Sequence, residues 1–139
     1  PGGGRVLLVD DEEEILTTTG AILTRLGYAV ATARDGRDAV RQYRDAAQAG
    51  APFDVVILDL TVPGGLGGRE ALEELRAVDP EVVAIASSGY SNDPVMAQYR
   101  TYGFAGVLTK PYTLQELSAA VRGVIRRGRT AHNNAAHSS

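Results

Sequence analysis

The sequence predicts an α/β fold in which five parallel strands form a doubly wound sheet with helices on both faces. Short apolar segments alternate with longer amphipathic ones along most of the chain, which is the pattern of repeated β/α units. Several of the short segments are almost wholly aliphatic, as strands buried on both faces are. The 139 residues correspond to one domain, because domains commonly contain about 100 to 200 residues.

The strand candidates are short runs rich in aliphatic residues. They are Arg5–Val9, Tyr28–Thr32, Val55–Leu58, Val82–Ala86 and Gly106–Leu108. None approaches the length of about 20 apolar residues that a membrane-spanning helix needs, and no basic-then-apolar leader begins the chain. We therefore expect a soluble, cytoplasmic domain that makes no contact with a membrane.

The first three helix candidates each follow one of the first three strands. The first begins near Glu12 and ends at Gly27, the second covers Gly36–Gln48 with Asp35 as its N-cap, and the third covers Gly68–Ala77. Their apolar residues recur at the spacing of one helix face. The residues expected to face the sheet are Ile15, Ile22 and Leu26 in the first helix, Val40, Tyr43 and Ala47 in the second, and Leu72 and Leu75 in the third.

The last two helix candidates have clear start signals. Asp93 and Pro94 supply an N-cap and an N1 proline for the fourth helix, and Gly103 closes it. Thr113 and Glu116 form a capping box that opens the fifth helix. The apolar residues of this fifth helix are Leu114, Leu117, Val121, Val124 and Ile125.

The two ends of the chain differ in composition from the rest. Residues 1–4 read PGGG and are interpreted as a linker remnant, and residues 128–139 are small and polar without periodicity, which predicts a disordered tail. The folded domain is therefore expected to cover residues 5–127.

Composition excludes several kinds of chemistry. The chain contains no cysteine, which excludes disulfides, thiolate metal sites and cysteine nucleophiles. Its two histidines, His132 and His137, lie in the polar tail. The folded domain therefore offers no positioned imidazole for a catalytic triad or a phosphohistidine carrier, and both functions are excluded. The net charge of -3 does not support direct binding of nucleic acid.

Polar and charged side chains stand at the carboxyl ends of four predicted strands. Asp10 and Asp11 follow the first strand, and Asp59 follows the third. The fourth and fifth strands are followed by Ser87, Ser88 and Lys110. Because the carboxyl ends of parallel strands lie at one edge of the sheet, where open α/β sheets bind ligands, we expect these side chains to converge.

Each of these residues has an ordinary explanation when it is taken alone. Asp10 and Asp11 could simply favour the start of a helix. Asp59, Ser87 and Ser88 could be turn or loop residues, and Lys110 could be an ordinary surface lysine. Their joint occurrence, each directly after an apolar strand, favours a functional site. Three converging carboxylates repel one another unless a cation lies between them, and Mg²⁺ is an oxygen-binding cation that suits such a group.

The combination resembles the receiver domain of two-component response regulators, from Arg5 to about Arg127. The motifs that carry the resemblance are VLLVDDEE with Asp10 and Asp11, DVVILDLTVPGG with Asp59, AIASSGY with Ser87, and GVLTKPYTLQEL with Lys110 and Pro111. Each motif is short, and the specificity comes from their order along five β/α units. The resemblance implies a flavodoxin-like (βα)5 sheet with strand order 2-1-3-4-5.

The resemblance also implies a role for each site residue. Asp59 accepts a phosphoryl group from a histidine kinase or a histidine phosphotransfer domain, in a Mg²⁺-dependent transfer that the domain itself catalyses, as it does the later dephosphorylation. The implied Mg²⁺ ligands are Asp10, Asp11, Asp59 and the backbone carbonyl of Thr61. The implied phosphate-binding residues are Leu60, Ser87, Ser88 and Lys110. The bond between Lys110 and Pro111 is cis in the family.

One position departs from the family pattern. Many receivers carry a tyrosine or phenylalanine three residues before the lysine, which turns inward when the hydroxyl residue moves, whereas this chain has Val107 there. We therefore expect the switch formed by Ser87 and Val107 to change the surface of the fifth strand only modestly.

Several readings of the whole protein remain open. The motifs resemble receivers at the C-terminus of hybrid sensor histidine kinases most closely, and a stand-alone single-domain regulator is the alternative. Aspartyl-phosphate hydrolases have a second aspartate at the position of Thr61. Their acid pair comes last in the sequence, whereas Asp10 and Asp11 come first here. A dinucleotide-binding domain needs glycines where Asp10 and Asp11 stand. A docking module that takes no phosphate is disfavoured because every expected site residue is present.

Overall fold

The strands and helices alternate along the chain as the sequence predicts. The computed structural model describes residues 3–61, 68–89 and 93–125. The strands are β1 (Arg5–Val9), β2 (Ala29–Ala33), β3 (Val55–Asp59), β4 (Ala84–Ser88) and β5 (Gly106–Thr109). The helices are α1 (Glu13–Arg25), α2 (Gly36–Gln48), α3 (Gly68–Val78) and α4 (Pro94–Ala97). Residues 114–125 form a further helix, called the C-terminal helix below; the expected tail at 128–139 lies outside the described residues.

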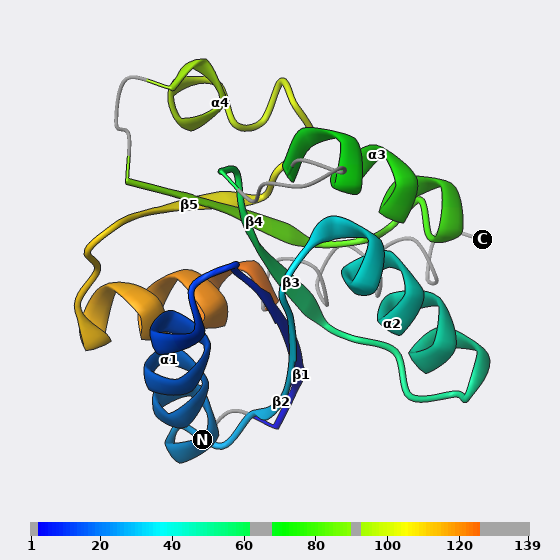
Figure 1. Ribbon diagram of the computed structural model, residues 1–139, viewed down its shortest axis with the longest axis horizontal. Coiled ribbons are helices and arrows are strands. Elements are labelled where there is room, and N and C mark those ends of the chain that lie inside the picture. Colours follow the sequence, from blue (N-terminus) through cyan, green and yellow to red (C-terminus); the bar gives the residue numbers. More distant parts are fainter. Residues whose placement is uncertain (1–2, 62–67, 90–92, 126–139) are drawn as a thin grey trace, which may run out of the picture.

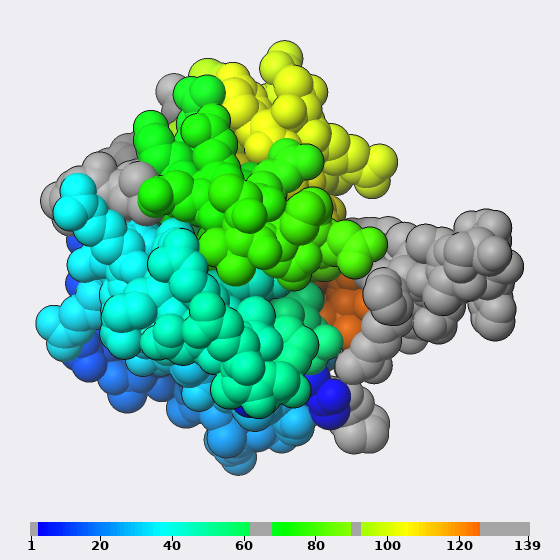
Figure 2. Space-filling view, turned by 90° about the vertical axis from the view of Figure 1, so that its right-hand side faces the viewer, coloured from blue at the N-terminus to red at the C-terminus, as the bar shows by residue number. Residues whose placement is uncertain are grey.

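All five strands are parallel and follow the order β2-β1-β3-β4-β5, which confirms the predicted doubly wound sheet. Helices α2 and α3 cover one face, and α1 and the C-terminal helix cover the other (Figure 1). The space-filling view looks onto α2 and α3, which lie side by side (Figure 2). The carboxyl ends of the strands therefore meet at one edge of a three-layered molecule.

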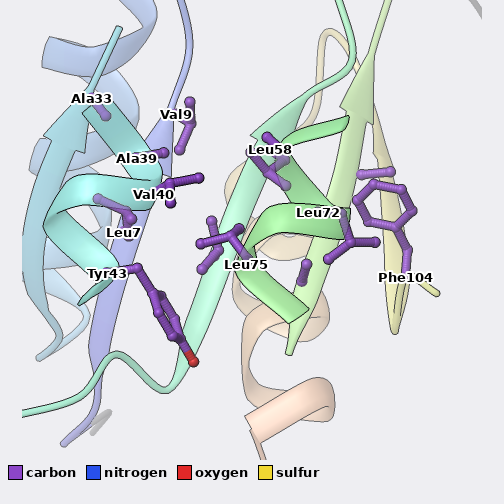
Figure 3. Close-up of a cluster of buried hydrophobic side chains, with 14 of the residues drawn as sticks. Leu7, Val9, Ala33, Ala39, Val40, Tyr43, Leu58, Leu72, Leu75 and Phe104 are labelled. Carbon is purple, nitrogen blue, oxygen red and sulfur yellow. The ribbon is translucent and has the colours of Figure 1, made fainter. Parts of the chain in front are cut away.

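The strands alternate their side chains between two hydrophobic clusters. The first cluster, between the sheet and α2, α3 and α4, contains Leu7, Val9, Val56 and Leu58. Leu7, Val9 and Leu58 are labelled in the close-up of this cluster (Figure 3). The second cluster lies between the sheet and the helices on the other face, and it contains the intervening strand residues Val6, Leu8, Val55 and Ile57. This alternation explains why β1 and β3 read as continuous apolar runs.

The buried faces of three helices differ from the prediction. In α1 the fully buried residues are Leu16, Thr19 and Leu23, not the predicted set of Ile15, Ile22 and Leu26, which are only partly buried. The predicted set and the buried set form two adjacent stripes along this helix, and the stripe of Leu16, Thr19 and Leu23 faces the sheet. The other two differences lie in terminal helix turns: Ala47 is exposed, and Leu114 is 51% exposed.

Two strands begin later than predicted. Tyr28 precedes β2, because its backbone N–H closes the end of α1 by donating to the carbonyl of Leu23, next to Gly27 with φ of 101°. Strand β4 starts at Ala84 and continues through Ser87 and Ser88, which pair with β3 and β5 through their backbones. Hydroxyl side chains do not interrupt this pairing, since the ladder uses backbone groups alone.

The predicted helix starts are confirmed, while one helix is shorter than expected. Asp35 and Asp93 each accept a hydrogen bond from a backbone N–H in the first turn of α2 and α4. Thr113 and Glu116 exchange the two bonds of a capping box, at 2.9 and 3.0 Å. Helix α4 ends at Ala97, and the chain from there to Gly103 forms tight turns instead of the predicted helix.

Gly3 and Gly4, assigned to a linker from the sequence, are hydrogen bonded to the fold. The N–H of Gly3 donates to the carbonyl of Gly27, and the carbonyl of Gly4 accepts from Ala29. Within the described ranges, none of the helices has the length and apolar character of a bilayer-crossing segment.

Candidate functional site

The predicted site residues meet at the carboxyl edge of the sheet. Asp59 is the last residue of β3, and it lies opposite Ser87 of β4 in the strand register. Asp10 directly follows β1, and Lys110 directly follows β5. The carboxylates of Asp10 and Asp59 belong to residues only 2% and 1% exposed, so charged groups have been taken out of water at this edge.

Lys110 supplies the positive charge between the two buried aspartates. Its Nζ donates to Asp10 Oδ2 at 2.6 Å and to Asp59 Oδ2 at 3.2 Å. The exposed carboxylate of Glu12 lies farther off, with Oε1 at 4.0 Å from the same nitrogen. One ammonium therefore compensates two buried carboxylates, which leaves the group with an excess of negative charge.

The ionisation of these groups follows from burial and from this pairing. Burial raises the pKa of Asp10 above its usual value, although the hydrogen bond from Lys110 opposes that rise. Burial acts to lower the pKa of Lys110, but the bond to Asp10 and the charges of Asp59 and Asp10 outweigh it and hold this pKa above its usual value. Lys110 therefore stays positively charged at neutral pH.

Asp59 is held on both of its oxygens. Oδ1 accepts from the backbone N–H of Thr61 at 3.0 Å and from the hydroxyl of Thr61 at 2.8 Å. Oδ2 faces Lys110. Sequence reasoning assigned Thr61 a role only through its carbonyl, because nothing in a sequence shows that a threonine hydroxyl turns back two residues onto an aspartate.

A cluster of carboxylates on the β1–α1 turn has the composition of a cation site. One oxygen from each of Asp10, Asp11 and Glu12 lies within 4.8 Å of the others. Asp10 is fixed by the N–H of Glu12, which donates to its Oδ1 at 2.9 Å, while Asp11 and Glu12 are exposed. An all-oxygen set beside a buried excess of negative charge fits a hard divalent ion. The sequence does not single out Glu12 as a site residue, because an acidic first turn of a helix explains it equally well.

Ser87 has a polar atom without a partner. Its Oγ is buried and makes no hydrogen bond in the described structure. A buried hydroxyl without a partner is uncommon, and this one stands on the strand next to Asp59. The atom is available to donate to a group that enters the site.

Residues 6–122 match the family model of the response regulator receiver domain. The chain belongs to this family. The receiver domain is 36% identical over 128 residues to the transcriptional regulatory protein TcrA of Mycobacterium tuberculosis, a match that covers 91% of this chain and 47% of TcrA. It is 37% identical over 129 residues to PrrA of the same organism, covering 91% of this chain and 52% of PrrA. The chain thus spans about half the length of these relatives.

Solved structures resemble the receiver domain over most of its length. A response regulator receiver domain protein from Clostridium thermocellum is 28% identical, with a TM-score of 0.81 over 92% of this chain and 98% of that one. The receiver domain of the sensor histidine kinase PA1611 from Pseudomonas aeruginosa is also 28% identical, with a TM-score of 0.77 over 89% and 98%. The PA1611 structure has a magnesium ion coordinated in its active-site cleft.

Two of the residues expected to bind phosphate have backbone groups engaged in hydrogen bonds. The backbone N–H of Leu60 donates to the carbonyl of Ser87 at 2.9 Å. Ser88 is fully buried, and its carbonyl accepts from the N–H of Lys110. The bond between Lys110 and Pro111 is cis, as expected.

Val107 occupies the aromatic position of the receiver switch. It lies in β5 opposite Ala86 of β4, and it packs half-buried against the first hydrophobic cluster. Between Ser87 of the switch and the N-cap Asp93 of α4, residues 90–92 lie outside the described residues.

Proposed function

We propose that Asp59 of this receiver domain accepts a phosphoryl group from the phosphohistidine of a histidine kinase or of a histidine phosphotransfer domain. The observation that carries the proposal is the buried arrangement around Asp59. Its carboxylate is bonded to the Lys110 ammonium, and the adjacent strand presents the unpartnered hydroxyl of Ser87. A nucleophile, a cation and a hydroxyl donor thus surround one small volume.

The chemistry needs no general base from the protein. An oxygen of Asp59 forms a bond to phosphorus while the bond from phosphorus to the histidine nitrogen breaks. The electron pair goes to that nitrogen, and the imidazole leaves neutral when its other nitrogen carries a proton. A carboxylate attacks without losing a proton, which agrees with the absence of a histidine from the described residues of the site.

Lys110 and Ser87 stabilise the charge that develops on the transferring group. The Lys110 ammonium stands 3.2 Å from Asp59 Oδ2, where the phosphoryl oxygens arrive, and electrostatic positioning is the main source of catalysis in phosphoryl transfer. The Ser87 hydroxyl donates to one of these oxygens and so gains the partner that it lacks in the described structure.

The same site fits Mg²⁺. Asp10, Asp11, Asp59 and the carbonyl of Thr61 would hold the ion, and Glu12 lies close enough to Asp10 and Asp11 to contribute through water. When bound, Mg²⁺ neutralises negative charge on the carboxylates and on the phosphoryl group. The N–H of Glu12 donates to Oδ1 of Asp10 and the Lys110 ammonium donates to Oδ2, and these two hydrogen bonds fix the orientation of the carboxylate.

Phosphorylation of Asp59 is tested with phosphoramidate and MgCl₂, followed by intact-protein mass spectrometry. The wild-type domain should gain one phosphate, and Asp59→Asn should gain none because the amide is not a nucleophile. Asp45→Asn is the matched control, since Asp45 is an exposed aspartate of α2, and it should be labelled normally. Undiminished labelling of Asp59→Asn contradicts the proposal.

The metal site is tested by thermal unfolding with and without MgCl₂. The wild-type domain should melt at a higher temperature with Mg²⁺, because a ligand that binds the folded state stabilises it. Asp11→Ala should lose this shift, and Glu14→Ala, in the exposed first turn of α1, should keep it. An unchanged Mg²⁺ shift in Asp11→Ala shows that the ligand set is wrong.

We further propose that the whole protein is a response regulator of the transcriptional type and not the hybrid sensor kinase expected from the motifs. The matches to TcrA and PrrA support this choice, since their identities of 36% and 37% exceed the 28% shared with the PA1611 receiver. Any contact with nucleic acid then belongs to another part of the protein. The complete coding sequence tests this, and a histidine kinase module within it contradicts the proposal.

A further inference from the structure

Thr19 is a polar residue in a position where the fold otherwise buries apolar side chains. It lies in the middle of α1 between the buried Leu16 and Leu23, and it is 4% exposed. In the described ranges, the other buried polar or charged residues all belong to the candidate site: Asp10, Asp59, Ser87 and Ser88. A buried hydroxyl needs a partner to offset its loss of water.

The partner of Thr19 is the hydroxyl of Tyr112, 93 residues farther along the chain. The two oxygens lie 3.1 Å apart. Tyr112 is half-buried and packs against the second hydrophobic cluster. Burial raises the pKa of Tyr112, so the phenol keeps its proton, and either of the two hydroxyls can donate to the other.

Tyr112 follows Lys110 by two residues, in a turn that has few other attachments. The N–H of Lys110 donates to the carbonyl of Ser88 at 2.9 Å, and the N–H of Thr113 donates to Glu116. Between these two anchors, Pro111 and Tyr112 take part in no backbone–backbone hydrogen bond with any described residue. The bond to Thr19 therefore fastens the turn that carries Lys110.

The other end of α1 is attached to the anionic side of the site. The N–H of Glu12 donates to Asp10 Oδ1 at 2.9 Å, and the N–H of Leu16 donates to the carbonyl of Glu12 in the first turn of the helix. An α-helix is a rigid element with a rise of about 1.5 Å per residue. Helix α1 thus links Thr19 to the loop of Asp10.

We propose that Thr19 and Tyr112 form a positioning pair that holds the Lys110 turn against α1 and so sets where the Lys110 ammonium stands between Asp10 and Asp59. The distances to be maintained are 2.6 and 3.2 Å, in the range where hydrogen bonds weaken steeply with misalignment. The pair touches neither substrate nor metal. Its effect on rate rests on the proposed function, whereas its effect on the position of Lys110 does not.

The test uses Tyr112→Phe and Thr19→Val, which remove one hydroxyl each and nearly preserve the side-chain shapes. Two quantities are measured: the NMR signals of the Lys110 side chain in the metal-free domain, and the rate constant of phosphorylation by phosphoramidate. Each variant should shift the Lys110 signals. Each should also slow phosphorylation by about threefold to tenfold, less than the roughly 100-fold cost of a 1 Å displacement.

Two further variants separate positioning from general weakening of the fold. Thr19→Ser keeps the hydroxyl and should restore both readouts. The double variant Thr19→Val/Tyr112→Phe should be no slower than the slower single variant, because the two residues act through one bond. Additive losses of rate in the double variant contradict the proposal.

Tyr43→Phe is the matched control. Tyr43 donates its hydroxyl to Asp79 at 2.7 Å from the cluster on the opposite face of the sheet. Its loss should lower the melting temperature and leave the Lys110 signals and the rate unchanged. If Tyr112→Phe behaves in the same way, its hydroxyl is purely structural and the inference is wrong. If the wild type takes no phosphate but Tyr112→Phe shifts the Lys110 signals, the proposed function fails and the positioning pair stands.

Discussion

In the described structure, the ammonium of Lys110 compensates the negative charges of the two buried carboxylates of the site. The side chains of Asp10 and Asp59 are 3% and 1% exposed, and Lys110 is the cation that the described structure places within hydrogen-bond distance of both. Two buried carboxylates on neighbouring strands repel each other and are poorly solvated. The lysine therefore contributes to folding as well as to phosphoryl transfer.

Lys110→Met should destabilise the metal-free domain strongly at pH 7. The substitution keeps the length of the side chain but leaves two buried carboxylates without a counter-charge, and breaking a buried pair costs about 3–5 kcal/mol. The free energy of unfolding is measured with urea. Asp10→Asn/Lys110→Met should recover part of the loss, since it removes one of the two unpaired charges. A stability of Lys110→Met equal to that of the wild type refutes this account of the charge balance.

Thr61 adds two hydrogen bonds from neutral groups to the carboxylate of Asp59. Its N–H and hydroxyl both donate to Oδ1 of Asp59, which leaves Oδ2 to Lys110. The two oxygens of the same carboxylate therefore have different partners. This difference could not be read from the sequence, because it depends on the side-chain rotamer of Asp59.

At the scale of the elements, α3 approaches the end of β3 too closely for any side chain larger than hydrogen. A Cβ on Gly68, the first residue of α3, would lie 2.9 Å from the Cα of Leu60 and 3.1 Å from the carbonyl oxygen of Asp59. The backbone of the phosphoacceptor strand is thus in direct contact with the start of a helix. Glycine at this position sets the distance between the two elements.

Gly68→Ala and Gly20→Ala should change stability in opposite directions. At Gly68 the added methyl group meets backbone atoms that cannot move freely, and such overpacking costs about 1–3 kcal/mol. At Gly20, in the interior of α1, the nearest atom is Val30 Cγ1 at 3.9 Å, so alanine should stabilise the helix by about 0.5–1 kcal/mol. Urea unfolding of both variants measures the difference, and destabilisation by Gly20→Ala or a neutral Gly68→Ala contradicts the packing argument.

At the scale of the whole molecule, the sheet separates two hydrophobic clusters, and beside each of them a tyrosine hydroxyl makes a hydrogen bond to another side chain. Tyr43 donates to Asp79 in the first cluster, and Tyr112 is bonded to Thr19 at the second. Burial raises the pKa of both tyrosines, and Asp79 raises that of Tyr43 further. Lys110, at the edge between the clusters, also has a raised pKa, because its carboxylate partners outweigh the effect of burial.

These shifts predict a loss of stability in alkali. A group whose pKa is raised in the folded state holds its proton to a higher pH there than in the unfolded chain. Its contribution to the free energy of unfolding is therefore complete below its unfolded-state pKa, near 10, and is lost as the pH rises above that value. Urea midpoints should therefore be nearly constant from pH 8 to about pH 9.5 and should fall above about pH 10. The urea midpoint of Tyr43→Phe should fall less steeply with pH in this range. A midpoint that stays constant to pH 11 rules this interpretation out.

The alternation of strands and helices, the parallel sheet and the meeting of Asp10, Asp59, Ser87 and Lys110 at one edge could all be predicted from the sequence. These follow from local patterns and from a geometric rule, since the carboxyl ends of parallel strands lie on the same side of a sheet. The capping residues Asp35, Asp93 and Thr113 were equally predictable, because a cap bonds to backbone atoms within a few residues of itself.

Which stripe of α1 is buried could not be predicted from the sequence, and neither could the hydrogen bond between Thr19 and Tyr112. Ile15, Ile22 and Leu26 form as good an apolar face as the stripe that contains Thr19, and the partner of Thr19 lies 93 residues away in the sequence. The same holds for the split of the Asp59 oxygens between Thr61 and Lys110. Hydrogen bonds between distant side chains require both groups to be positioned to within about 0.5 Å, and that position is set by packing of the whole domain rather than by any local pattern.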